Sequence, residues 1–368
     1  MKSDLFKPTG KLRTGWTTGA CATAAAKAAL QALLQGHFEK DVTIRLPGGQ
    51  QPTFPLSRQS LEHNQASAGI IKDAGDDPDV THGAEIIVTV KAGTPGSGLT
   101  FQAGQGVGTV TLPGLPIAVG EAAINPAPRK MITQALQELA DAYEIPADFI
   151  ITVAIPGGEK LAQKTMNGRL GIIGGLSVLG TTGIVKPYSC SAWIHSIHSG
   201  IDVARATGIS HIAASTGNTS EAAIKKLYSL RDSALIDMGD FAGGVLKYLR
   251  HHPIEKLTLA GGFGKLVKLA QGNMDLHSAR SKLDFTMLAC SLTELGAAPD
   301  TVAEAKSAIT AMAVLELSQT NNLALADLIA ARARQVALDA VDDGLKIEVC
   351  IFNKNSALVG RAAGEFDD

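Results

Sequence analysis

The organisation of this chain is decided by residues 156–189, which read PGGEKLAQKTMNGRLGIIGGLSVLGTTGIVKPYS. This stretch is rich in glycine and follows a clear strand pattern at 149–155, but it keeps no helical or strand period of its own. Glycine allows backbone conformations and close approaches that other residues resist, at an entropic cost on folding. Two interpretations are open: a glycine-rich crossing between two packed domains, or a segment whose N–H groups and basic side chains wrap a bulky anionic ligand. Those side chains are Lys160, Lys164, Arg169 and Lys186.

The pattern changes after this stretch, near residue 190. Strand and helix patterns then alternate with short connections: helices at 190–207, 220–230 and 240–251, strands at 210–215, 234–237 and 256–259, a helix from Phe263, helices over 283–341 and a last strand at 346–353. Repeated β-α units of this kind predict a parallel sheet in three layers. We therefore expect an α/β protein of two domains. An N-terminal α+β domain, 1–189, ends in the crossing, and a C-terminal Rossmann-like parallel-sheet domain covers 190–368.

Composition excludes several classes of function. The 368 residues carry a net charge of −2, which gives no global attraction to nucleic acid or to an acidic membrane, and aromatic residues are too few for a base-stacking platform. Four widely spaced cysteines argue against a zinc knuckle or a disulfide framework. No signal peptide or membrane span is recognisable, so we expect a cytoplasmic protein. The oligomeric state stays open, a homo-oligomer included.

The Ala-rich part of residues 12–36 predicts a helix that Thr17 or Thr18 caps. Its T-T-G turn places N–H groups and the positive end of the helix dipole at one point, near Arg13 and Lys27, which would suit a carboxylate. The alternative is a well-capped helix packed through its small residues.

Residues 66–83, ASAGIIKDAGDDPDVTHG, predict a short helix that runs into an acidic loop. Five of its side chains are of types that bind hard cations: Asp73, Asp76, Asp77, Asp79 and His82. The calcium-loop spacing with a closing Glu is missing, which favours a solvated or capping loop. Strands are also predicted at 84–91 and 99–102, joined by a Gly/Pro turn, and an amphipathic helix at 124–143. The glycines at 104–108 are a weak dinucleotide signal, because no helical pattern follows them.

Three loops follow predicted strands of the second half: TGNTSE at 216–221, DMGDF at 237–241 and AGGFGK at 260–265. Ligands of open α/β sheets bind beyond the carboxyl ends of the strands, and Asp237 follows Gly217 by roughly 20 residues, the separation at which an acid reaches ribose hydroxyls. A nucleoside-containing ligand is therefore predicted. The sequence lacks the P-loop motif of ATP sites. The first loop has a single glycine, which makes NAD a less favoured ligand and favours S-adenosylmethionine, a ligand without phosphate. The alternative is that these glycines serve only in tight turns between strands and helices. His195 and His198 lack an accompanying acid, so a packed or surface pair is favoured over a metal site.

Several long, ordered motifs resemble the cobalt-precorrin-5B C1-methyltransferase family of anaerobic cobalamin biosynthesis, over nearly the whole chain. They are RTGWTTGACATAAAKAA at 13–29, KDAGDDPDVTHG at 72–83, INPAPRKMI at 124–132, the stretch at 155–189, and the loops at 216–221 and 260–265. Trp16 stands where the family pattern has Tyr, and NGRL at 167–170 varies NPRL.

The resemblance implies transfer of the S-adenosylmethionine methyl group to C1 of a cobalt-precorrin, with cobalt held only within the substrate and no metal site on the protein. On this basis we hypothesise that the second domain holds S-adenosylmethionine through Gly217, Asn218, Thr219, Asp237, Gly261 and Gly262. The macrocycle would lie between the domains against Thr17, Thr18, Arg129, Lys160 and Thr182, and Asp76 or Asp77 would accept a proton. An NAD-dependent oxidoreductase and a non-catalytic tetrapyrrole-binding protein stay open as alternatives.

Overall fold

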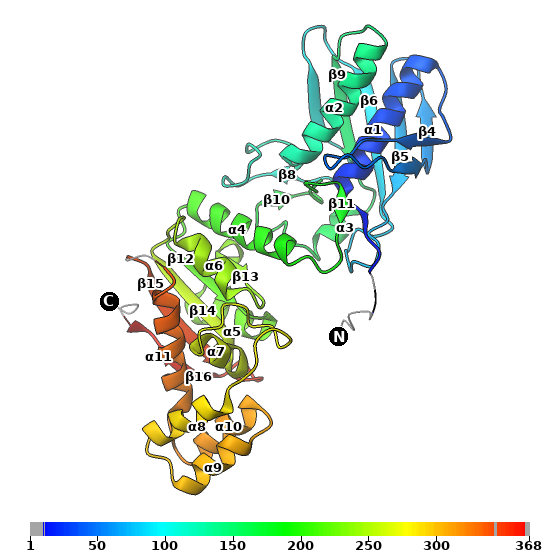
Figure 1. The fold of residues 1–368 in the computed structure, drawn as a ribbon. Coiled ribbons are helices and arrows are strands. Elements are labelled where there is room, and N and C mark those ends of the chain that lie inside the picture. Colours follow the sequence, from blue (N-terminus) through cyan, green and yellow to red (C-terminus); the bar gives the residue numbers. More distant parts are fainter. Residues whose placement is uncertain (1–9, 11, 342–343, 365–368) are drawn as a thin grey trace. The chain divides into compact units, whose positions relative to one another are not determined.

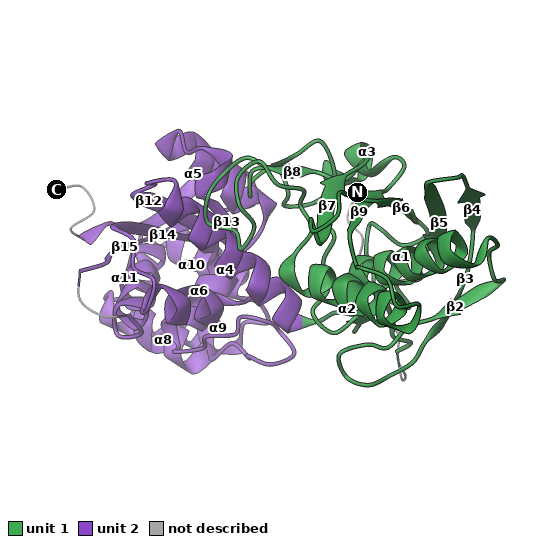
Figure 2. Cartoon of the chain, turned by 90° about the horizontal axis from the view of Figure 1, so that it is seen from above, with its two compact units in different colours: residues 1–189 green, residues 190–368 purple. Residues whose placement is uncertain are grey.

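The computed structural model describes residues 10, 12–341 and 344–364. The chain divides into two compact units, residues 1–189 and 190–368, which are coloured separately in Figure 2. Each unit has its own buried apolar core. None of the helices in the described residues is long and apolar enough to cross a membrane.

Unit 1 is built on a five-stranded sheet in the order β4-β5-β6-β9-β7 (Figure 1). Its strands are β4 (Arg58–Leu61), β5 (Gln65–Ile71), β6 (Glu85–Ala92), β7 (Leu99–Ala103) and β9 (Phe149–Ala154). All neighbours pair antiparallel except β7 and β9, which are parallel. Helices α1 (Thr18–Gln35) and α2 (Pro126–Ala142) pack on each other, and α1 lies against β5 and β6. Alanines fill most of the buried positions of α1, so this helix approaches the sheet closely.

One expectation for this unit is wrong. The short helix predicted from residue 66 is the strand β5, which pairs with β4 and β6 and buries Ala66, Ala68 and Ile70. The alternation of these apolar residues decides the outcome over the helix propensity of alanine. The strands predicted at 84–91 and 99–102 are confirmed as β6 and β7, and β9 lies between them in the sheet.

The glycine-rich stretch 156–189 belongs to unit 1 and packs against the other glycine-rich segment, 103–120. It contains α3 (Gly158–Ala162), β10 (Ile172–Ile173), which pairs with β8 (Thr109–Val110), and β11 (Ile184–Val185), which pairs with β1 (Gly15–Trp16). A Cβ atom added at Gly158 or at Gly175 would lie 2.2 Å from the carbonyl oxygen of Gly106. These two glycines are therefore required by backbone-to-backbone packing. A small hairpin of β2 (Asp41–Thr43) and β3 (Thr53–Pro55) completes the unit.

Unit 2 is built on a sheet in the order β13-β12-β14-β15-β16. The strands β12 (His211–Ser215), β13 (Leu235–Asp237), β14 (Lys256–Gly262) and β15 (Lys346–Phe352) are parallel, as the alternating pattern predicted. A fifth strand that the sequence did not indicate, β16 (Leu358–Ala362), pairs antiparallel with β15.

Helices cover both faces of this sheet. On one face α5 (Asn218–Tyr228) packs on a small apolar cluster that includes Ala213 and Phe352. The larger core on the other face lies beneath α4 (Cys190–Ala206), α6 (Ala242–Leu249), α7 (Phe263–Ala270) and α11 (Leu325–Leu338). The short helix η1 (Asp232–Ala234) leads into β13. Three helices follow α7 in the chain before α11: α8 (Phe285–Glu294), α9 (Pro299–Ser307) and α10 (Ala311–Thr320).

Candidate functional site

The direction of winding in unit 2 reverses between β12 and β14, and we call the region beyond the carboxyl ends of these two strands the crevice. The chain leaves β12 through α5 toward β13 and returns through α6 to β14 on the other side of β12. Ligands of open α/β sheets bind where the direction of winding reverses in this way, outside the carboxyl ends of the strands. The loops after the two strands meet there, since a Cβ atom at Gly261 would lie 2.9 Å from Thr216 Oγ1.

Two helices begin at this crevice without a capping side chain. The residues at their N-caps are Gly217 for α5 and Gly262 for α7, and neither helix has a side-chain cap among the described residues. The first N–H groups of a helix require acceptors from outside it, and they attract negative charge. A Cβ atom at Gly217 or Gly262 would meet none of the described residues within 4 Å, so both loops leave space beside these two glycines. The predicted site residues Asn218 and Thr219 form the exposed first turn of α5.

Asp237 ends β13 beside this crevice and is partly exposed. The Trp193 indole on α4 donates a hydrogen bond of 3.0 Å to its backbone oxygen. The next two N–H groups, those of Met238 and Gly239, donate to the backbone oxygen of Ser215. The turn after β13 is thus tied to both α4 and β12, and the sheet brings Asp237 to the same edge as Gly217 and Gly262.

Ser215 is a residue of this site that sequence reasoning missed. It is the last residue of β12 and is 1% exposed, and its hydroxyl has no hydrogen-bond partner among the described residues. A buried hydroxyl without a partner costs free energy, and such a group in a native structure calls for an explanation. The available signal was a polar residue that ends an otherwise apolar strand directly before a T-G turn. Lys265, just past the third loop, forms an ion pair with Asp240.

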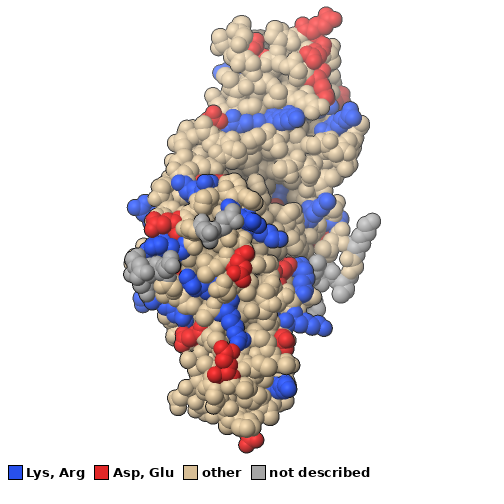
Figure 3. Space-filling model, turned by 60° about the vertical axis from the view of Figure 1, so that its left-hand side comes forward, with Lys and Arg blue, Asp and Glu red and all other residues tan. Residues whose placement is uncertain are grey.

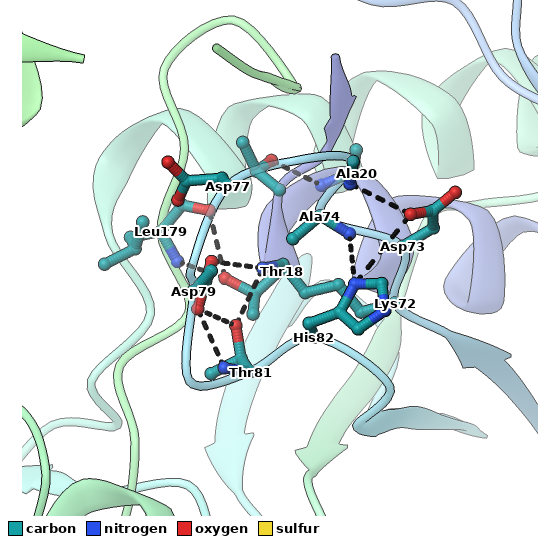
Figure 4. A network of polar contacts seen from close by, with 12 residues as sticks. Thr18, Ala20, Lys72, Asp73, Ala74, Asp77, Asp79, Thr81, His82 and Leu179 are labelled. Carbon is teal, nitrogen blue, oxygen red and sulfur yellow. Dashed lines mark hydrogen bonds and ion pairs between the residues drawn. The ribbon is translucent and has the colours of Figure 1, made fainter. Parts of the chain in front are cut away.

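The acidic loop of unit 1 uses its charges within the fold (Figure 4). Arg13 forms a hydrogen-bonded ion pair with Asp73, which lowers the pKa of that carboxyl to about 2. Asp76 accepts the Arg13 N–H at 2.6 Å, and Asp77 accepts the Tyr188 N–H at 2.8 Å. His82 Nδ1 accepts the Ala74 N–H at 3.1 Å. The loop is therefore of the capping kind that its spacing favoured.

The structural centre of this loop is Lys72, which sequence reasoning passed over. The lysine is 1% exposed, and its ammonium group pairs with Asp79 and donates to Thr81 Oγ1 at 2.7 Å. Burial by itself raises the pKa of Asp79, but the Lys72 charge and the hydrogen bonds from Lys72 and Thr81 outweigh it and lower the pKa. A buried ammonium group without a counter-ion would be strongly unfavourable, so Asp79 holds the loop closed over Lys72.

The first turn of α1 is occupied by the chain itself. Thr17 caps the helix through a 3.1 Å hydrogen bond from the Ala20 N–H, and the Gly19 N–H donates to the Leu179 oxygen at 2.9 Å. Thr18 Oγ1 accepts from the Leu179 N–H at 3.0 Å. Thr17 and Thr18 are 6% and 3% exposed. Both threonines hold the glycine-rich stretch on α1, and of the two interpretations of this turn the well-capped helix is confirmed for the N–H groups of Gly19 and Ala20.

The other predicted substrate residues of unit 1 differ in their exposure. Arg129 is partly buried: it donates to the backbone oxygens of Ile124 and Ala122, pairs with Glu121 and lies over the ring of Phe101. Lys160 on α3 and Thr182 are exposed. Contact of any of these residues with a substrate stays a prediction.

Two family models match the chain, one described as CbiD over residues 6–187 and one described as CbiD, C-terminal domain, over residues 275–363. A protein of Brucella anthropi named cobalt-precorrin-5B C(1)-methyltransferase is 54% identical over 367 residues, which cover 98% of this chain and 100% of that protein. The chain belongs to the CbiD family. Proteins of the same name from Brucella canis and Brucella suis are 56% identical over 352 residues, 95% of this chain and 96% of each relative. A crystal structure of the cobalamin biosynthesis protein CbiD from Archaeoglobus fulgidus is 28% identical, covers 74% of this chain and 84% of that one, and aligns with a TM-score of 0.40.

The histidine pair of this CbiD family member shows no metal-site geometry. His198 Nε2 lies 3.2 Å from the Gly244 oxygen, and its ring stacks on Tyr248. His195 is exposed on the same helix. Nowhere in residues 10, 12–341 and 344–364 do three or more His, Cys, Asp or Glu side chains gather so that they could hold a metal ion.

Charge on the face drawn in Figure 3 is mixed. Lys and Arg side chains lie among Asp and Glu side chains there rather than in one large basic field. This distribution agrees with the net charge of −2. An anionic ligand of this CbiD family member would therefore be attracted by local groups rather than by the field of the whole molecule.

Proposed function

We propose that this protein methylates C1 of cobalt-precorrin-5B in anaerobic cobalamin biosynthesis, with S-adenosylmethionine as methyl donor and cobalt-precorrin-6A as product. The observation that carries the proposal is similarity at 54–56% identity, over nearly the whole chain, to proteins named for this reaction. In the reaction the nucleophilic carbon of the macrocycle forms a bond to the methyl carbon. The bond between the methyl carbon and the sulfonium sulfur breaks, and the electron pair of that bond stays on sulfur as S-adenosylhomocysteine leaves.

The proposed donor site is the crevice of unit 2, which would then serve as a Rossmann-like S-adenosylmethionine domain. Asp237 would accept hydrogen bonds from the ribose hydroxyls, as acids at the end of a second strand do in related sheets. The uncapped N–H groups after Gly217 and Gly262 offer donors to the carboxylate of the methionine part. The buried hydroxyl of Ser215 supports the proposal, because a ligand in the crevice would give it a partner.

Methyl transfer from a sulfonium asks mainly for positioning. Effective in-line alignment and exclusion of water supply most of the rate increase, and no metal on the protein is needed when the macrocycle is itself electron-rich. Cobalt enters as part of the substrate. A location in the cytoplasm stays a prediction from the sequence.

The residues that we propose for the substrate are those of unit 1. Arg129 and Lys160 would meet the carboxylate side chains of the macrocycle, and Thr182 would lie beside them. Thr17 and Thr18 would act by holding residues 179–183 in place, since both are buried. Asp76 and Asp77 stay the proposed proton acceptors, each carboxylate being fixed in position by a backbone N–H.

Isothermal titration calorimetry with S-adenosylmethionine tests the donor site. Asp237→Ala should weaken binding by at least roughly tenfold, the loss of a charge-assisted hydrogen bond to the ribose. Ser215→Ala should weaken binding less and leave the unfolding temperature of the free protein unchanged or slightly raised, because it removes an unpartnered buried group. Unchanged affinity of the Asp237 variant would refute the site.

A thermal-shift screen separates the remaining classes of function. S-adenosylmethionine should raise the unfolding temperature and NAD should not, since only a ligand of the native state stabilises it. Stabilisation by NAD alone would favour an oxidoreductase, and corrinoid binding without any effect of S-adenosylmethionine would favour a tetrapyrrole carrier.

A further inference from the structure

Unit 2 contains a cavity of about 540 Å³ that shares Phe241 with the 237–241 loop but is lined by none of the residues proposed to contact the methyl donor. It lies between α4 and α6, and the segment that contains Met274 and Arg280 also lines it. Cavities that hold small molecules have volumes of roughly 300–1,000 Å³. This one is of sufficient size to take part of a large ligand.

The floor of the cavity is apolar and lacks side chains where α6 begins. Gly243 faces Met274, and Gly244 faces Ile194 of α4 and Phe241. A Cβ atom at Gly244 would make ordinary contacts, 3.4 Å to Ile194 and 3.5 Å to Phe241. Residue 244 therefore adds no side chain to the cavity, although the local backbone does not require a glycine there.

One wall is a rigid stack of rings. Tyr248 lies between His198 and His252, with ring centroids 3.8 and 4.0 Å apart, and its hydroxyl donates to Asp202. His198 and Tyr248 both line the cavity. Since the stack is fixed from both sides and at its hydroxyl, the shape of the wall is set before a ligand binds.

The rim carries an excess of positive charge. Arg280 forms an ion pair with Asp275, whereas Lys247 is exposed and makes no ion pair within the part of the chain that the structure describes. A phosphate group is not favoured as the occupant, because the Gly243 N–H at the start of α6 already donates to the Met274 oxygen at 2.8 Å. The lining suits an apolar body with a negative group at its edge.

We infer that this cavity binds one edge of the corrinoid substrate, with the ring against the floor of glycine, Ile194 and Phe241, and a peripheral carboxylate at Lys247. The inference rests on the proposed function for the identity of the substrate, and it adds a substrate contact in unit 2 to those proposed in unit 1. A corrinoid combines these two features: an extended apolar ring and side chains that end in carboxylates.

Equilibrium dialysis against aquocobyrinic acid, a stable cobalt corrinoid with free carboxylates, tests the cavity directly. Gly244→Leu places a branched four-carbon side chain on the floor of the cavity and should weaken binding by at least about tenfold, and Gly244→Ala should weaken it about two- to fivefold. Alanine at this helical position should not destabilise the protein, because it has a higher helix propensity than glycine. Gln319→Leu is the matched control: it places the same side chain at an exposed position of α10 that does not line the cavity.

Two lysine variants test the contribution of positive charge at the rim of the cavity. Lys247→Gln should weaken dialysis-measured affinity about two- to fivefold, the contribution of one exposed ion pair, and the loss should shrink as salt is added. Lys226→Gln on α5, which removes an exposed lysine that does not line the cavity, should leave the affinity unchanged. Equal losses in both variants would show a general charge effect and would overturn the contact with Lys247.

Tryptophan fluorescence locates the bound corrinoid. Trp193 lies 6.3 Å from Phe241 between ring centroids, and Trp16→Tyr leaves Trp193 as the one tryptophan of the chain. Aquocobyrinic acid should quench Trp193 strongly in this background, and Gly244→Leu should shift the quenching curve to higher concentration by the same factor as the dialysis.

The outcomes separate the inference from the function on which it rests. Corrinoid binding that Gly244→Leu and Lys247→Gln leave unchanged would overturn the cavity site while the proposed function stands. A wild-type protein that binds S-adenosylmethionine and no corrinoid would count against the proposed function. A change in molar mass by light scattering in Gly244→Leu, with unchanged corrinoid affinity, would identify a second copy of the chain as the occupant and would also overturn the inference.

Discussion

The loops of unit 1 and the strand-end loops of unit 2 use the same kinds of residue for opposite purposes. In unit 1 the carboxylates of the 72–83 loop accept hydrogen bonds from the chain, and the backbone of Gly106 occupies the space beside Gly158 and Gly175. In unit 2 a Cβ atom at Gly217 or Gly262 would meet none of the described residues within 4 Å, and among those residues the helices that start there have no side-chain cap. An acidic or glycine-rich motif is therefore not by itself evidence of a ligand site, because the fold can use the same groups.

The largest effect that tests this contrast is expected at the buried ion pair. Asp79→Asn leaves the Lys72 ammonium group buried without a counter-ion and should lower the free energy of unfolding by about 3–5 kcal/mol. Lys72→Met should cost less, about 1–2 kcal/mol, because the Asp79 side chain is 26% exposed and keeps its hydrogen bonds from Thr81. Urea denaturation measures both. A smaller loss in Asp79→Asn than in Lys72→Met would contradict the role assigned to the pair.

The glycines provide the next comparison. Gly158→Ala would place its Cβ 2.2 Å from a backbone oxygen and should cost about 3 kcal/mol, since the neighbouring chain must move. Gly262→Ala has an ordinary φ of −74° and open space, so it should change stability by less than about 0.5 kcal/mol. The same substitution should weaken S-adenosylmethionine binding, which calorimetry can check. If Gly262→Ala unfolds the protein as readily as Gly158→Ala, the contrast between the two regions fails.

The smallest effect is expected from the surface pair of Arg13 and Asp73. The pKa of Asp73 is about 2 in the folded protein, below its usual value near 4, so the pair stabilises the protein above roughly pH 4 and this contribution is lost as pH falls toward 2. Both side chains are substantially exposed, which limits the effect to roughly 1–2 °C in Tm. Asp73→Asn should remove this part of the pH dependence in thermal melts, whereas Asp76→Asn should leave it. An identical acid profile in wild type and Asp73→Asn would exclude the linkage.

Much of the fold followed from local patterns. The capped, Ala-rich helix α1 and the alternating elements of unit 2 were predictable because capping residues and apolar periodicity act within a few residues. The strand β5 was predicted as a helix because its alanines favour helix, and pairing with β4 and β6 overrides this local preference. The position of β9 between β6 and β7 is a long-range choice that no local pattern contains.

The same division holds for the candidate site. The sequence by itself determined the family, through ordered motifs, and the three loops that follow parallel strands. Only the tertiary structure decided which polar groups already have partners within the protein, because those partners lie far along the chain. Arg13 pairs with Asp73, and Leu179 accepts from the first turn of α1. The hydroxyl of Ser215 has no partner among the described residues. A residue type states what chemistry is available, and burial and hydrogen bonding determine whether that chemistry is left for a ligand.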